Sequence, residues 1–164
     1  MHRDDPEMRG EVERLLRPFV EEALPEGGVD AARSPWQKPG RGSASGSGMF
    51  PGGIDVRYLR VLAAALYQAA ELSDEPLYHR IADAHVRYMA RSIGGQHPTW
   101  ALGNALEMIG LYHRFNERDE ELVRAAGRLV EAARARRVQV RTRRGTELCH
   151  FPCGYGVLQA KDAG

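Results

Sequence analysis

The sequence is poor in cysteine, in long apolar segments and in net charge, and each shortage excludes a class of protein. Two cysteines in 164 residues argue against a secreted fold held by disulfides. No apolar run approaches the roughly 20 residues that span a bilayer, and the charged N-terminus lacks a signal peptide's apolar stretch. A formal net charge of +1 gives no overall attraction to nucleic acid or an acidic membrane. We therefore expect a cytoplasmic protein with neither partner.

Motifs that bind common cofactors are also missing. The sequence contains no GxGxxG, Walker A, HExxH or GxSxG pattern, so no cofactor is expected. Cys149, His150 and Cys153 supply three side chains that zinc accepts, but zinc needs further ligands at a structural site. Two small buried thiols beside a loop histidine is the simpler interpretation. No metal is predicted, and metal binding by these three residues stays an open alternative.

The chain does carry the apolar content of a globular protein, 43% against 27% charged, arranged in three parts. Residues 1–28 contain a helix predicted over Pro6–Leu24, with Pro18 expected to kink or split it. Residues 29–53 are rich in glycine, serine and proline, which predicts a flexible linker or, alternatively, a loop that closes over a site. Residues 54–164 form the main helical domain.

Four helices are predicted in this domain as two pairs that repeat at an offset of 45 residues. They cover Asp55–Leu72, Pro76–Ile93, Trp100–Phe115 and Glu120–Arg137. Leu66-Tyr67 matches Leu111-Tyr112, and Asp74-Glu75 matches Asp119-Glu120. A fixed offset indicates stacked antiparallel hairpins, each too small to bury its own apolar face. The first helix of each pair is apolar on most sides, which predicts that it lies inside.

The second helix of each pair is amphipathic. In Pro76–Ile93 the predicted inner face holds Leu77, Ile81, Ala84 and Tyr88. Farther along, alternation over residues 138–142 and 146–151 around a glycine turn predicts a small β-hairpin. The fold class is therefore all-α, with one small β-hairpin near the C-terminus.

The hairpin pattern resembles that of the α/α-toroid superfamily, which includes six-hairpin glycosidases and polysaccharide lyases. Tyr58-Leu59, Leu66-Tyr67 and the run Leu72-Ser73-Asp74-Glu75-Pro76-Leu77-Tyr78 carry the resemblance, which covers about residues 52–137. It implies a partial toroid, a fragment of a toroid or one part of an oligomer, because a full toroid has more helices than this chain. It also implies a site at the N-terminal ends of the inner helices, beside the loops that are rich in glycine and proline.

This resemblance selects the candidate site residues. The candidate catalytic residues are His97, Asn104, Tyr58, Tyr155 and Asp55, and the candidate substrate-binding residues are Trp100, Arg57, His150 and Trp36. An aromatic ring can cover the apolar face of a sugar while amide and imidazole groups bond its hydroxyls. The resemblance to lyases implies that Asn and His groups neutralise a uronate while a tyrosine moves the proton. Structural roles remain the alternative: a capping histidine, a packed tryptophan, a buried amide and, for Asp55, a helix N-cap.

Two functions follow from these observations. The first is a carbohydrate-active protein of toroid type, a glycoside hydrolase or polysaccharide lyase with no pair of acids marked by the sequence for hydrolysis. The second is a non-enzymatic helical-repeat module that binds a partner protein. Because four helices leave apolar faces uncovered, we also expect a homo-oligomer or a missing partner chain.

Overall fold

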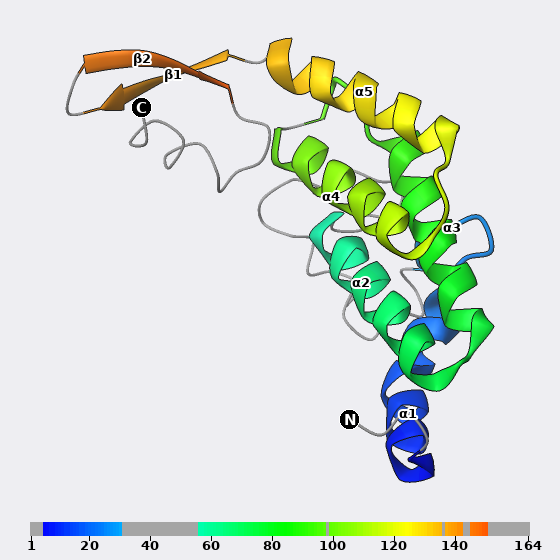
Figure 1. The fold of residues 1–164 in the computed structure, drawn as a ribbon. Helices are drawn as coiled ribbons and strands as arrows, with labels where there is room; N and C mark the ends of the chain where they lie inside the picture. The colour runs from blue at the N-terminus through cyan, green and yellow to red at the C-terminus, as the bar shows by residue number, and fades with distance from the viewer. Residues whose placement is uncertain (1–4, 31–55, 98, 136, 143–144, 151–164) are drawn as a thin grey trace. The chain divides into compact units, whose positions relative to one another are not determined.

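The computed structural model describes residues 5–30, 56–97, 99–135, 137–142 and 145–150, and they are mainly α-helical (Figure 1). These residues form, in order, α1 (Pro6–Glu22), α2 (Val56–Ser73), α3 (Pro76–Ser92), α4 (Thr99–Phe115), α5 (Glu120–Ala135), β1 (Arg137–Thr142) and β2 (Gly145–His150). They fall into two compact units, divided between Met89 and Ala90. No helix in the described ranges is long and apolar enough to cross a bilayer. The predicted helical class is confirmed, and the four repeat helices end within two residues of their expected bounds.

Helix α1 opens the first unit, and its sequence fixes both of its ends. The Asp5 carboxylate accepts hydrogen bonds from the backbone N–H groups of Glu7 and Met8, and Pro6 occupies the first turn, where its missing donor costs nothing. The expected split at Pro18 does not occur, because proline removes only one donor and its ring lies on the exposed side. The helix ends at Glu22, since Ala23 has an extended backbone.

Helices α2 and α3 follow in the same unit and are joined by a short turn (Figure 1). Asp74 makes that turn with a φ of 53°, a left-handed conformation that aspartate tolerates better than most residues. The α2 side chains that are buried share one broad apolar face and are Val56, Leu59, Leu62, Ala63, Leu66, Tyr67 and Ala69. The opposite face is open, with Val61 58% exposed.

The inner face predicted for α3 is wrong. Leu77 is exposed, whereas the buried side chains are Tyr78, Ala82, His85, Val86, Met89 and Ala90. Two contacts lie beside this stripe: Gly27, in the turn after α1, approaches Ala84, and the Tyr67 hydroxyl of α2 donates to Asp83. Ala84 and Tyr88, on the predicted face, are only partly buried.

Helices α4 and α5 form the second unit together with β1 and β2. They run alongside each other in Figure 1, with α4 buried more completely. The buried residues of α5 form a single stripe, Leu122, Ala125, Leu129 and Ala133, as its amphipathic sequence predicts. Strands β1 and β2 pair antiparallel, with Arg137 opposite His150 and Thr142 opposite Gly145.

Candidate functional site

A buried carboxylate meets a tyrosine hydroxyl where α1 ends and α2 begins. The hydroxyl of Tyr58, the third residue of α2, donates a hydrogen bond to Glu22 Oε1. Glu22 is the last residue of α1 and has no exposed surface, although Tyr58 retains some. The Phe19 ring, one turn before Glu22, lies 6.5 Å from the Tyr58 ring. The pair therefore joins a hidden acid to a hydroxyl that reaches the surface.

The second carboxylate oxygen of Glu22 has no hydrogen-bond partner in the structure. Burying a polar group without a partner costs roughly 1–3 kcal/mol, and burying a charge costs more. Such groups are concentrated at functional sites, where the environment is arranged for proton transfer. The Glu22–Tyr58 pair is therefore our candidate site.

The turn after α1 determines where Glu22 lies. The backbone N–H of Asp30 donates to the Glu22 carbonyl over 2.7 Å, and Ala23 pairs with Val29 as an isolated antiparallel bridge. The N–H of Gly28 donates to Nδ1 of His85, over 3.1 Å. These bonds fasten the end of α1 to the middle of α3.

A second polar group in the first unit links α2 to α3. The hydroxyl of Tyr67 donates to Asp83 Oδ1 over 2.7 Å, and His79 Nδ1 lies 3.5 Å from Asp83 Oδ2. The Tyr67 and His79 rings also meet edge to face, at 5.2 Å. Tyr67 is fully buried while His79 and Asp83 are partly exposed, so this group ties the two helices together at the margin of the core.

The predicted site residues Asn104 in α4 and His97 in the loop before it are both bonded to nearby backbone. Asn104 Nδ2 donates to the Trp100 carbonyl over 2.7 Å, one turn earlier. His97 Nδ1 lies 3.1 Å from the Gly94 nitrogen, at the end of the loop after α3. Both contacts use a polar atom that sugar recognition would need. A ligand could therefore bond to His97 only through Nε2, and to Asn104 only through Oδ1 and the second Nδ2 hydrogen.

The other predicted site residues are placed as follows. Arg57 is exposed on the first turn of α2, and His150 ends β2 opposite Arg137. Asp55, Trp36 and Tyr155 lie outside the described residues, as do Cys153 and most of the predicted linker. Within the described part of the chain, no three histidine, cysteine or acidic side chains are grouped to hold a metal ion.

Sequence reasoning missed Glu22 and His85, although a signal was present for each. Glu22 continues the 3–4 spacing of Val12, Leu15 and Phe19, so an acid occupies an apolar stripe. His85 likewise falls on the stripe of Tyr78, Ala82 and Met89. A polar residue at a position where the helical spacing predicts an apolar one therefore indicates a candidate functional residue.

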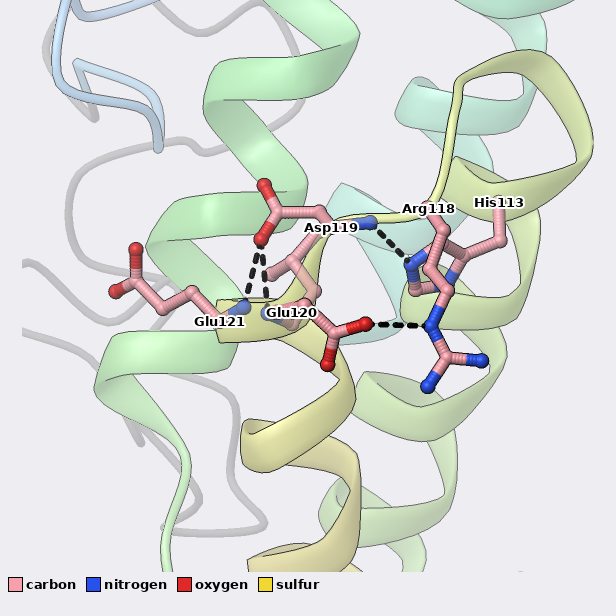
Figure 2. A network of polar contacts seen from close by, with 6 residues as sticks. His113, Arg118, Asp119, Glu120 and Glu121 are labelled. Atoms are coloured by element: carbon pink, nitrogen blue, oxygen red, sulfur yellow. Dashed lines mark hydrogen bonds and ion pairs between the residues drawn. The ribbon is translucent and has the colours of Figure 1, made fainter.

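The turn between α4 and α5 holds a network of polar contacts (Figure 2). The carboxylate of Asp119 accepts bonds from the N–H groups of Glu121 and Leu122 and so caps α5. Asp119's own N–H donates to His113 Nε2, over 3.2 Å.

A shallow depression of about 270 Å³ lies at this turn, lined by His113, Arg118 and Val123. Arg118 bonds to Glu120 across 2.7 Å, with both side chains well exposed. Its charge is already matched, so we interpret this network as a helix cap and not as a reactive site.

No protein family, curated protein or solved structure matches this chain.

Proposed function

We propose that the chain is a carbohydrate-active protein of α/α-toroid type, with its reactive group where α1 meets α2. The observation that carries the proposal is the hydrogen bond from Tyr58 to the buried Glu22. In this proposal the helix pairs are stacked as a partial toroid, with α2 and α4 as inner helices and a β-hairpin after α5. Tyr58 then lies at the N-terminal end of an inner helix, where toroid enzymes hold their substrates.

The pair has the chemistry that proton transfer requires. A tyrosine hydroxyl that donates to a carboxylate can take a proton from a substrate while its own proton moves to Glu22. The reverse transfer delivers a proton to a leaving oxygen. Because Glu22 is hidden and Tyr58 is not, Tyr58 is the group that meets the substrate and Glu22 is the group behind it. The proposal therefore favours a polysaccharide lyase, in which one proton moves and no second acid is needed, over a hydrolase.

The test is to incubate the full chain with uronate-containing and neutral polysaccharides. Lyase products are detected by the ultraviolet absorbance of the new C4–C5 double bond, and hydrolase products by new reducing ends. With a substrate found, Tyr58→Phe should lower kcat by about 10²–10⁴ with little change in KM.

Tyr67→Phe is the matched control, because it also removes a hydroxyl bonded to a carboxylate, but at the other end of α2. Equal losses in the two variants would contradict the role of Tyr58. A chain that binds and cleaves none of the polysaccharides would reject the proposal as a whole.

A non-enzymatic module that binds a partner is the second candidate. Leu15 and Val61 are 54% and 58% exposed, on helices α1 and α2, and the polar atoms of Asn104 and His97 are already used. Large exposed apolar residues on helices are typical of interaction surfaces. If the occupant is another copy, sedimentation should show a dimer that Val61→Ser weakens, while the same change at exposed Arg128 of α5 has no effect. A stable monomer at high concentration would count against self-association.

A further inference from the structure

His85 is the one fully buried histidine in the described part of the chain, and its two ring nitrogens differ. Nδ1 accepts the Gly28 N–H, so the ring is neutral with its proton on Nε2. Nε2 has no hydrogen-bond partner in the structure. The only partner of this ring is therefore the backbone of the turn that follows α1.

Backbone hydrogen bonds connect Gly28 to the end of α1, where Glu22 lies. The N–H of Leu24 donates to the Gly28 carbonyl over 3.1 Å, and the N–H of Gly27 donates to the Leu24 carbonyl over 2.9 Å. Gly27 has a φ of 92° and approaches α3 so closely that a Cβ atom would stand 2.0 Å from the Ala84 carbonyl oxygen. The turn is seated directly on α3, where the Tyr88 side chain lies against both glycines and His85 accepts a hydrogen bond from the Gly28 N–H.

We infer that His85 is a positioning residue for the Glu22–Tyr58 pair, since it holds the turn after α1 and through it the buried carboxylate. The inference rests on the proposed function for its meaning, but the contacts themselves are independent of any substrate. His85 touches no reacting atom. Its role is to keep Glu22 against Tyr58 while Tyr58 meets the substrate.

The bond between Gly28 and His85 depends on the charge of the ring, because only neutral imidazole can accept the Gly28 N–H. Imidazolium carries hydrogen on both nitrogens, so protonation would break this bond. Burial lowers the pKa of His85 to about 4, which keeps the ring neutral at ordinary pH. Other titratable groups lie on the segments around it: Glu22, Glu26 and Asp30 in α1 and the turn, Asp83 and Tyr88 on α3, and Tyr67 on α2.

The experiment is proton NMR on the full chain, with two variants at this position. The readouts are the exchange rate of the Gly28 amide and the hydroxyl proton of Tyr58, assigned with Tyr58→Phe; the Tyr67 hydroxyl proton is the internal reference. His85→Leu should speed Gly28 exchange at least about tenfold and abolish the Tyr58 signal while the Tyr67 signal remains. His85→Asn, whose side-chain oxygen can replace Nδ1 as acceptor, should restore both.

Acidification of the unmodified chain provides a measurement that does not depend on either variant's folding. Both signals should be lost together near the pKa of His85, and His85→Asn should not show this transition. A transition that persists in His85→Asn belongs to the carboxylates and would overturn the inference. So would a Tyr58 signal that survives His85→Leu after Gly28 has lost its protection. Failure of the proposed function, shown by absent turnover, leaves these NMR readouts unaffected.

Discussion

Helices α3 and α5 occupy the same place in the 45-residue repeat, yet they bury different faces. The buried residues of α5 are Leu122, Ala125, Leu129 and Ala133, which correspond 45 residues earlier to Leu77, Arg80, Ala84 and Tyr88. Of these four α3 residues, none is buried, and the buried stripe instead contains Tyr78, Ala82, Val86 and Met89. The repeat in the sequence is therefore not repeated in the packing.

The difference comes from the segment that precedes the first pair. The turn after α1 packs on α3 and donates a hydrogen bond to His85, while the buried residues of α5 form a single stripe. Polar side chains are also buried near this contact: among the described residues, the fully buried polar side chains are Glu22 and His85. In the second unit, the described polar contacts of the α4–α5 turn are partly or fully exposed caps. A helix that packs outside the repeat is thus what creates the candidate site.

The largest expected effect tests whether the turn is seated on α3. Gly27→Ala places a Cβ atom 2.0 Å from a backbone oxygen of Ala84, at a φ that alanine rarely adopts. We expect a loss of about 3 kcal/mol or more in the free energy of unfolding, measured by urea denaturation. Gly127→Ala in α5 is the control, because it meets no atom within 4 Å and should raise stability by up to about 1 kcal/mol. Equal changes in the free energy of unfolding for the two variants would show that the turn after α1 is not packed tightly on α3.

The next effect concerns pH and again separates the units. Burial lowers the pKa of His85 from 6.5 to about 4 in the folded chain. Between these two pH values His85 is therefore protonated in the unfolded chain and neutral in the folded chain. Stability contributed by neutral His85 is thus present above about pH 6.5 and is lost as pH falls toward 4, by about 3 kcal/mol in total. Urea midpoints across this range should show the loss, and His85→Asn should flatten it. A profile unchanged by that substitution would contradict the assignment.

A smaller effect is expected at the candidate site itself. Tyr58→Phe removes the hydroxyl that donates to Glu22 and leaves both oxygens of the buried carboxylate without this donor. Stability should fall by about 1–3 kcal/mol, as calorimetry or denaturation can measure. Glu22→Gln combined with Tyr58→Phe should lose less than the two single changes added together, because the residues share one bond. Strict additivity would show that the pair is not coupled.

The smallest effect compares the two aspartates that the repeat aligns. Asp119 caps α5, so Asp119→Ala should cost about 1 kcal/mol. Asp74 instead lies in a turn and has a left-handed backbone conformation, which glycine adopts more easily than aspartate. Asp74→Gly should therefore be neutral or stabilise the fold by less than about 1 kcal/mol. Thermal melts of both variants test this. A similar loss in each would show that the two turns work alike after all.

Local signals in the sequence predicted the helices well but the site poorly. Helix bounds followed from caps and breakers such as Pro6, Pro76 and Asp119, whose effects act within one turn. Tyr58 was predicted as a catalytic residue, but its partner Glu22 lies 36 residues earlier across a glycine-rich segment that gives no pairing signal. His97 and Asn104 were predicted from the resemblance to toroid enzymes, and the structure shows each bonded to nearby backbone.

The sequence alone determined, to within about two residues, where each described helix begins and ends, and that residues 55–93 and 100–137 share one hairpin pattern. Caps, breakers and apolar spacing are local properties, which is why the sequence contains this information. Only the tertiary structure decided which of two adjacent apolar stripes on α3 is buried, because both satisfy the helical period and the choice depends on what packs against them. It also decided that Glu22 and His85 are buried, since the burial of a polar side chain is set by segments that are distant in the chain.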